Sequence, residues 1–392
     1  MAFLKIFGKA HSVTRVVEIH FQRHAIKKYL FQKLANRRHF PKELPLSLPR
    51  KLFPGPILLP VSSYVLGAAF RHQSTCYFCT NSRHLKALII DGKAIAQDIK
   101  DEIKAEVEVF LDHGFRTPHL TVILVGNDPA SVIYVRNKAK AAGYTGVTCE
   151  VLRLPDTVSE KALLREIEFL NSQPDVDGIL VQLPLPEHIS ERKVCDAVRP
   201  DRDVDGFNVL NVGRFCVNED AFVPATPSGV LEIIRRLDID TFGKNAVVCG
   251  RSKIVGMPIA MHLHSSSKGN RGEGDATTVI CHRNTPREEL IKFTRAADIL
   301  VTATGVPGLI TADMVSEGVI VIDIGITRIT TKQGRTKLVG DVDYEGVSEK
   351  ASMITPVPGG VGPVTVAMVI KNTLMAYKIG LQNYQSKEHH EK

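Results

Sequence analysis

A tyrosine and a lysine four residues apart are the first pair in this sequence that could do chemistry together. Tyr134 and Lys138 lie in residues 129–142, whose pattern predicts a helix. Residues four apart share one face of a helix, so a phenol and an ammonium group could meet one substrate there. The same pair also occurs on solvated helices without a role. The spacing alone leaves both interpretations open.

Two further polar residues stand where α/β enzymes place their sites. Gln182 ends a predicted apolar strand, residues 178–183, and ligands bind beyond the carboxyl ends of such strands. Asp205 is the last of three alternating acids that begin at Asp201. These acids indicate a turn or a Ca²⁺ loop, but no Glu stands at the twelfth position that an EF-hand requires. Residues 356–363, PVPGGVGP, predict a tight loop.

A glycine-containing loop, residues 250–258, follows a fully apolar strand and opens a helix. Glycines let a diphosphate approach the backbone, and the N–H groups and dipole of a helix start attract the anion. The spacing is not GxGxxG, so a plain strand-to-helix turn remains an equal alternative. Two later strands end in small residues at Thr304, Gly305 and Gly325, where a nicotinamide ring could lie on bare backbone.

The elements around these residues alternate between short β-branched runs and amphipathic helices, which is typical of an α/β fold. We expect two lobes: residues 85–223, completed by residues 355–381, and a parallel-sheet dinucleotide-binding lobe, residues 224–354. The stiff junction Pro224 to Pro227 separates them, and the last helix returns to the first lobe. Residues 382–392 are expected to be a disordered tail. The predicted strands are 120–125, 148–152, 178–183, 246–249, 278–281, 299–302 and 319–324, and the predicted helices are 94–113, 129–142, 159–171, 228–237, 258–264, 286–294 and 364–381.

The positive charge of the chain belongs to its first 84 residues, which hold 14 Lys and Arg against two acids. The remainder holds 36 Lys and Arg against 40 acids, so nucleic-acid binding is not expected. The basic segment, with interleaved apolar residues, predicts an organellar leader. Its apolar stretch, residues 56–70, is shorter than the roughly 20 residues of a membrane span, so no stable membrane insertion is expected. Seven scattered cysteines suit a reducing compartment.

Seven motifs in order resemble the bifunctional methylenetetrahydrofolate dehydrogenase/cyclohydrolase family over about residues 87–380. They are DPASVIYVRNKAKA, GILVQLPLP, DRDVDGFNVLNVGR, PATPSGV, GRSKIVGMPIA, KLVGDVD and ITPVPGGVGPVTVAM. The basic leader and the segment GEGDATTVICHRNTP look most like the mitochondrial, NAD-dependent branch. The resemblance implies oxidation of 5,10-methylenetetrahydrofolate with NAD, hydrolysis of the methenyl product to 10-formyltetrahydrofolate, a Rossmann-type cofactor lobe, a homodimer and a location in the mitochondrial matrix.

By this resemblance Lys138 is the central catalytic group, Tyr134 stacks on the aminobenzoyl ring, Gln182 positions Lys138 and Asp205 holds the pterin. Activation of water near neutral pH then requires a lysine pKa well below the ordinary value of about 10.4. The folate pocket is expected to include Val181, Leu183, Pro358, Gly359, Gly360 and Val361.

Arg251 and Arg283 alone would predict NADP, because arginine recognises a 2′-phosphate. The resemblance implies instead that they hold inorganic phosphate, with Mg²⁺ bound by Asp275, so that NAD is preferred and NADP is weaker. The branch carries an acid after its GRxC motif, whereas this chain has Asn218. The expected cofactor residues are Gly250, Arg251, Ser252, Val255, Gly256, His282, Arg283, Thr304, Gly305 and Ile326.

Two other functions fit parts of the pattern. Another two-lobed Rossmann dehydrogenase, of the shikimate or amino-acid type, would share the fold but lack Tyr-x-x-x-Lys followed by VQLPLP. A non-catalytic folate-binding homologue would have no need of Lys138, Gln182 and Asp205 together.

Overall fold

The computed structural model describes residues 86–266, 274–330 and 334–390, with the backbone alone for residues 384–390. The predicted leader, residues 1–84, lies outside the described residues. The description below concerns the unit that follows it.

The first lobe is built on a three-stranded parallel sheet in the order β3 (Thr148–Leu154), β2 (His119–Val125) and β4 (Gly178–Val181). Its strands are connected by α3 (Pro129–Thr145) and α4 (Glu160–Ser172), and α5 (Glu191–Ala197) and α6 (Val209–Cys216) follow β4. In α4 the Ser159 hydroxyl accepts the N–H of Ala162, and Leu163 and Ile167 are buried, as the apolar stripe predicts.

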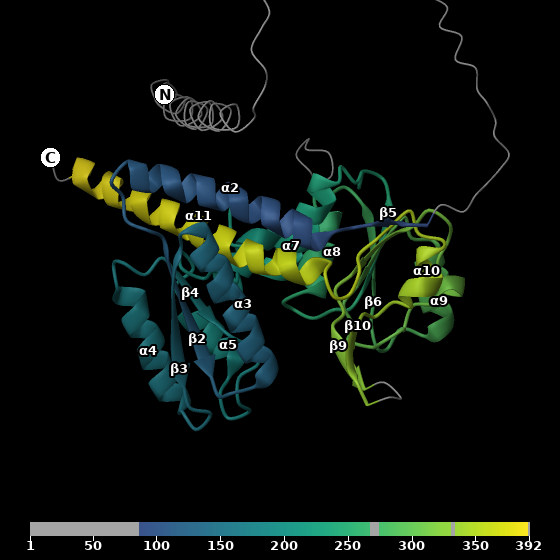
Figure 1. Cartoon of the computed structure of the whole chain (residues 1–392), viewed down its shortest axis with the longest axis horizontal. Helices are drawn as coiled ribbons and strands as arrows, with labels where there is room; N and C mark the ends of the chain where they lie inside the picture. Colours follow the sequence, from purple (N-terminus) through teal and green to yellow (C-terminus); the bar gives the residue numbers. More distant parts are fainter. Residues whose placement is uncertain (1–85, 267–273, 331–333, 391–392) are drawn as a thin grey trace, which may run out of the picture. The chain divides into compact units, whose positions relative to one another are not determined.

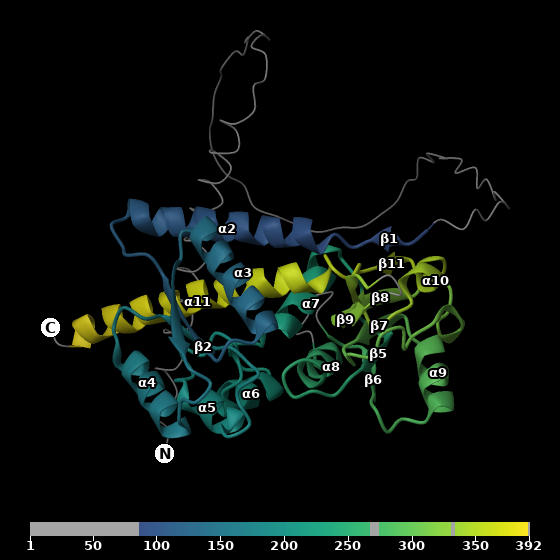
Figure 2. The same ribbon diagram turned by 60° about the horizontal axis from the view of Figure 1, so that its bottom comes forward.

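The second lobe is built on a six-stranded parallel sheet, and Figure 2 shows its strands one below another. The order is β1 (Leu88–Ile89), β11 (Met353–Ile354), β8 (Ile320–Asp323), β7 (Ile299–Thr302), β5 (Asn245–Cys249) and β6 (Thr277–Cys281). Around it lie α8 (Gly256–His264), α9 (Arg287–Arg295), α10 (Tyr344–Ser348) and the short 3₁₀ helix η1 (Ala312–Met314). The predicted parallel dinucleotide-binding sheet is confirmed.

One expected boundary differs from the structure. Residues 85–223 were expected to belong to the first lobe, but β1 pairs with β11 in the sheet of the second lobe. The Ile90 N–H also donates to Ile354 O at 2.8 Å. Strands of two residues carry too little periodicity to be found in a sequence. The antiparallel hairpin β9 (Thr327–Thr330) and β10 (Thr336–Val339), whose four-residue strands pair with each other outside both main sheets, was missed as well.

Two long helices tie the lobes together. In Figure 1, α2 (Gly92–Asp112) and α11 (Val361–His390) run side by side, and α11 also packs against α3 and α7 (Ala225–Arg236). A common apolar core contains Ile99 of α2, Val364 of α11 and Val248 of β5. The expected return of the last helix to the first lobe is confirmed.

The disordered tail predicted for residues 382–392 was wrong over most of its length, because α11 continues to His390. Gln, Lys and Glu are frequent after Leu381 and favour a helix. Within α11, Val361–Asn383 is apolar and long enough to cross a membrane by composition. More than half of its most apolar window is buried inside the protein, as in the core helix of a globular fold.

Candidate active site

Lys138 lies on α3 with its ammonium group buried. Asp128 begins this helix by accepting the Ser131 N–H at 2.7 Å, and Pro129 occupies its first turn. The Lys138 side chain is 8% exposed, and its Nζ donates to Gln182 Oε1 at 2.9 Å. The Gln182 Nε2 donates to Leu183 O at 2.7 Å, which fixes the orientation of the amide. The predicted pairing of Lys138 with Gln182 is therefore present.

Burial sets the proton affinity of this site. Desolvation lowers the pKa of Lys138 below its ordinary value of 10.5, although the Asp205 carboxylate opposes the shift. Desolvation also raises the pKa of Asp205 to about 6, while Lys138 acts in the opposite direction. Burial is the largest cause for both groups, so both charged forms are disfavoured. A poorly solvated ammonium group is the kind of group that can give up its proton near neutral pH.

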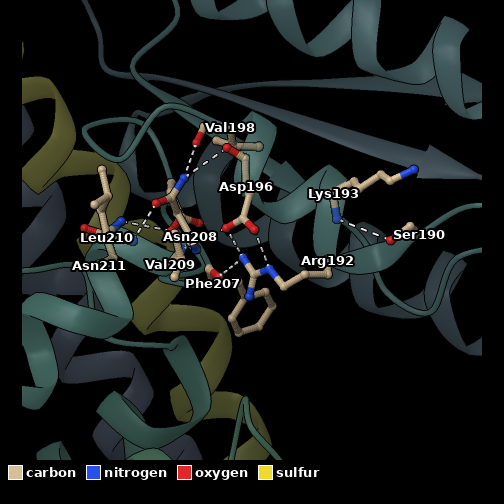
Figure 3. Close-up of polar contacts among 11 residues, drawn as sticks. Ser190, Arg192, Lys193, Asp196, Val198, Phe207, Asn208, Val209, Leu210 and Asn211 are labelled. Carbon is tan, nitrogen blue, oxygen red and sulfur yellow. Dashed lines mark hydrogen bonds and ion pairs between the residues drawn. The ribbon is translucent and has the colours of Figure 1, made fainter.

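The loop that carries Asp205 is held by a network of hydrogen bonds (Figure 3). Asn208 caps α6 by accepting the Leu210 N–H at 2.8 Å, and its Nδ2 donates to Val198 O at 2.9 Å. Arg192 pairs with Asp196 and donates to Phe207 O at 2.7 Å.

The alternating acids have separate roles in the structure. Asp203 accepts the N–H of Asn208 and the Nδ2 of Asn211, whereas Asp201 pairs with Arg199. The three acids therefore form a turn rather than a Ca²⁺ loop, and Asp205 alone faces the site.

Lys138, Gln182 and Asp205 line a cavity of about 290 Å³ between the lobes. Tyr134, 38% exposed, lines both this cavity and a larger neighbouring one of about 920 Å³. The expected loop residues Pro358, Gly359, Gly360 and Val361 line the larger cavity, and Leu183 lines the smaller one.

The close approach of Gly92 to this loop needs glycine, because a Cβ there would lie 1.7 Å from Gly360 O. Val181 differs from expectation. Its side chain is 6% exposed and belongs to the apolar core with Leu163 and Ile167, so it lines neither cavity.

A separate pocket of about 650 Å³ opens at the carboxyl ends of β5, β6 and β7. Six expected cofactor residues line it: Gly250, Arg251, Ser252, His282, Arg283 and Thr304. Gly256 begins α8 directly behind the loop, and a Cβ there would lie 2.2 Å from Gly250 O. A positively charged pocket at this edge of a parallel sheet, with backbone this close, fits a dinucleotide.

The loop differs from expectation in the partners of its backbone N–H groups, which were expected to face an anion. The Ser252 Oγ accepts the N–H groups of Val255 at 3.1 Å and of Gly256 at 3.3 Å, so the first turn of α8 is capped from within the chain. The Thr304 N–H donates to Asp341 Oδ2 at 2.5 Å. Val255 and Ile326 line the 290 Å³ cavity instead of the pocket, and Gly305 adopts a φ of 71° beside Thr304.

Asp275 does not lie beside the two arginines of its own chain, which corrects the expected metal site. It precedes β6, whereas Arg283 follows β6, and this strand alone spans roughly 13 Å at about 3.3 Å per residue. The Asp275 N–H donates to Ser265 O, and Asp275 O accepts the Gly243 N–H, at the opposite edge of the sheet. Among the described residues, no three His, Cys, Asp or Glu side chains gather to hold a metal ion.

Sequence reasoning missed several residues that line these spaces. Arg287, the first residue of α9, adds a third arginine to the dinucleotide pocket. Phe207, Ile254 and Thr365 line the 290 Å³ cavity, and Lys93 lines the larger one. Arg287 stands four residues after Arg283, where α9 begins, and this spacing could have indicated it from the sequence. The other four residues line the cavities only because the two lobes pack together, which the sequence does not show.

Comparisons with known proteins agree with this arrangement. The family model "Tetrahydrofolate dehydrogenase/cyclohydrolase, catalytic domain" matches residues 90–205, and "Tetrahydrofolate dehydrogenase/cyclohydrolase, NAD(P)-binding domain" matches residues 224–381. The mitochondrial bifunctional methylenetetrahydrofolate dehydrogenase/cyclohydrolase 2 of Rattus norvegicus is 54% identical over 77% of this chain and 89% of that protein.

Two solved structures are similar as well. The 5,10-methylenetetrahydrofolate dehydrogenase of Bombyx mori has a TM-score of 0.71 and 51% identity, over 76% of this chain and 99% of that one. The Trypanosoma brucei dehydrogenase-cyclohydrolase, solved with NADP and an inhibitor, has a TM-score of 0.70 and 38% identity, over 76% and 99%. With the catalytic and NAD(P)-binding domains both matched, and the predicted Lys138 and Gln182 in contact, this chain belongs to the tetrahydrofolate dehydrogenase/cyclohydrolase family.

Proposed function

We propose that this chain oxidises 5,10-methylenetetrahydrofolate to the methenyl form with NAD, and then hydrolyses the methenyl group to give 10-formyltetrahydrofolate. The observation that carries the proposal is the buried contact of Lys138 with Gln182 in a cavity that Asp205 and Tyr134 also line. A non-catalytic homologue would not need a desolvated lysine there. The family relationship disfavours the shikimate and amino-acid dehydrogenases.

Each residue has a physical task in this proposal. Tyr134 stands where the two cavities meet and offers a ring face to an aromatic substrate. Asp205 accepts hydrogen bonds from the pterin, and the loop of Gly359 and Gly360 leaves room for the rest of the folate. Lys138 in its neutral form takes a proton from water that attacks the methenyl carbon, and Gln182 aims its Nζ. When bound, the nicotinamide ring would accept the hydride from the methylene carbon.

The test follows methenyltetrahydrofolate by its absorbance, first as it forms from the methylene substrate with NAD and then as it disappears by hydrolysis. We expect both activities in the unmutated chain. Lys138→Met should lose the hydrolysis, whereas Lys161→Met, on the exposed surface of α4, should retain it. Hydrolysis by Lys138→Met at the unmutated rate would contradict the proposal.

We propose that the chain prefers NAD and uses inorganic phosphate in place of a 2′-phosphate. Arg251, Arg283 and Arg287 line the pocket, which supports an anion beside the adenine ribose. NADP, which carries its own phosphate, would bind but give weaker activity. Initial rates with NAD, measured with phosphate removed and then restored, test this. Indifference to phosphate together with faster use of NADP would contradict it.

We further propose a homodimer that forms through β6. β6 is an edge strand of the described sheet and pairs there with β5. The main-chain groups of its outer edge can therefore pair with a second copy. Antiparallel pairing centred on Val279 would bring Asp275 of one copy opposite Arg283 of the other, because each lies four residues from Val279. Such a pair could supply the carboxylate that Mg²⁺ needs beside phosphate oxygens, which Asp275 cannot do within one chain. Sedimentation measures the dimer, and rates with and without Mg²⁺ test the ion separately.

We propose that the protein acts in the mitochondrial matrix, after removal of a leader that lies within residues 1–84. The supporting observations are the strongly basic composition of this segment and the mitochondrial relatives. Mass spectrometry of the endogenous protein should find a new amino terminus between about residues 30 and 85. A mature protein that retains Met1, or one found outside mitochondria, would contradict this assignment.

A further inference from the structure

Two buried cysteines stand side by side on the floor of the dinucleotide pocket. Cys249 ends β5, Cys281 ends β6, and the two residues are direct partners in the parallel register. Both side chains are 1% exposed and belong to the same apolar cluster, so they lie on the same face of the sheet. The two thiols are therefore neighbours and not merely close in the backbone.

Both cysteines are also lining residues of the pocket. Cys249 and Cys281 both line the 650 Å³ space, together with Gly250 and His282, the residues that follow them. A small uncharged molecule that enters the empty pocket could reach the sulfurs, whereas a bound dinucleotide would cover them. Ligand binding and thiol chemistry thus compete for one space.

The two thiols differ in acidity. Their interaction lowers the pKa of Cys281, against the opposing effect of burial, and raises the pKa of Cys249. The thiolate is the reactive form of cysteine, so Cys281 is the nucleophile and Cys249 holds the proton.

We propose that Cys249 and Cys281 form a peroxide-sensitive dithiol that closes to a disulfide inside the pocket and weakens dinucleotide binding. The oxidant is hydrogen peroxide, which is small enough to enter. The Cys281 thiolate attacks one peroxide oxygen, the O–O bond breaks, and the departing hydroxide takes a proton to leave as water. The Cys249 sulfur then attacks the Cys281 sulfenic acid and forms the S–S bond. Its proton and the sulfenic hydroxyl leave as a second water molecule, so two thiols and one peroxide give one disulfide and two waters.

The backbone permits this bond but does not fit it perfectly. Neighbouring strands lie about 4.8 Å apart, within the roughly 4.4–6.8 Å Cα separation of disulfides. Hydrogen bonds hold both strand ends: Gly250 N–H donates to Cys281 O at 2.8 Å, and Ala303 N–H donates to Cys249 O at 2.7 Å. A disulfide formed against these constraints would be readily reduced, as regulatory disulfides are. It would also shift Gly250 and His282, which line the pocket.

The experiment treats the full chain with hydrogen peroxide and maps its peptides by mass spectrometry before and after reduction with dithiothreitol. We expect a Cys249 to Cys281 cross-link, its suppression by prior addition of NAD, and its full reversal by the reductant. The map separates this bond from any that Cys76 and Cys79 form. In parallel, fluorescence of bound NADH should show about ten-fold weaker binding after oxidation.

The controls are single substitutions. Cys281→Ser and Cys249→Ser, each compared with itself before and after peroxide, should show no change in NADH binding on oxidation, whereas Cys195→Ser should lose affinity as the unmutated chain does. Oxidation of exposed Cys216 without any Cys249 to Cys281 cross-link would overturn the proposal, and so would a cross-link that leaves NADH binding unchanged. The cross-link is detected by mass spectrometry and not by an activity assay. Its absence would contradict this proposal without contradicting the proposed dehydrogenase and hydrolase reactions.

Discussion

Replacement of Lys138 by Met removes one charge from the centre of the site and keeps nearly the same chain length. Lys138 is 8% exposed, and its ammonium group contacts Gln182 Oε1. The substitution leaves that oxygen without its donor, which costs about 1–3 kcal/mol. It also removes the cost of burying an ammonium group, which acts in the opposite direction. The free energy of unfolding should therefore change by no more than about 2 kcal/mol.

The effect on the reaction is expected to be much larger. A positioned group that transfers a proton contributes about 10² to 10⁴ in rate, equivalent to about 3–5 kcal/mol of the barrier. Hydrolysis should fall by this factor or to background, with the dehydrogenase strongly impaired. Asp205 loses the neighbouring cation that lowers its pKa, so its pKa in the variant should lie above about 6.

The assay measures both activities and the unfolding of the same preparation. In the unmutated chain the hydrolysis rate should rise with pH as Lys138 loses its proton, with an inflection below 10.5 because burial lowers its pKa. This limb should vanish in Lys138→Met. A folded variant that hydrolyses at the unmutated rate, or a rate that falls as pH rises through this range, would refute the reasoning.

Four further outcomes follow from the same contacts. Asp205→Asn should weaken folate binding and stabilise the unliganded protein at pH 7.5 by up to about 3 kcal/mol. The reason is that a carboxyl group with a pKa of about 6 in the folded protein destabilises the fold as pH rises from about 4 through 6. Urea unfolding at pH 4 and 7.5 measures this effect, and a variant less stable than the unmutated chain at pH 7.5 would contradict it. Tyr134→Ala should raise KM for the folate about 2–10-fold while Tyr134→Phe leaves it unchanged, and equal KM values for both would exclude stacking. Arg283→Ala should abolish the response of the NAD rate to phosphate, with Arg165→Ala on α4 as the control that retains it. Val279→Lys should convert the dimer to monomers in sedimentation, whereas an unchanged sedimentation coefficient would place the interface elsewhere.

The predicted fold was most accurate where a single element carried its own signal. The strand around Val248 and the helix from Pro129 were found because periodicity and capping are local properties. β1 and β11 were missed because two-residue strands exist only through their pairing with each other and with β8. The predicted end of α11, at residue 381, was too early because the apolar pattern weakens there, while the helix continues through polar residues to His390.

The site shows the same division. Tyr134, Lys138, Gln182 and Asp205 were predicted from motif and resemblance, and all four line one cavity. Val181 was included because it precedes Gln182, but alternate residues of a strand face opposite sides, and its side chain enters the core. Asp275 was assigned to the metal from the resemblance, and the structure separates it from Arg283 of the same chain by the five residues of β6.

The pairing of β1 with β11 has a consequence for the order in which the protein can fold. β1 is made before α2 and nearly all of the first lobe, yet its partner Met353–Ile354 leaves the ribosome some 260 residues later. The second lobe therefore cannot complete its sheet until almost the whole chain has been synthesised. Contacts of such large sequence separation slow folding. We therefore expect the six-stranded sheet to close late, rather than strand by strand during synthesis. A fragment that begins at residue 224 would lack β1, the edge strand of the second sheet, and a fragment that ends there would lack α11. Neither lobe is therefore complete within one continuous half of the chain.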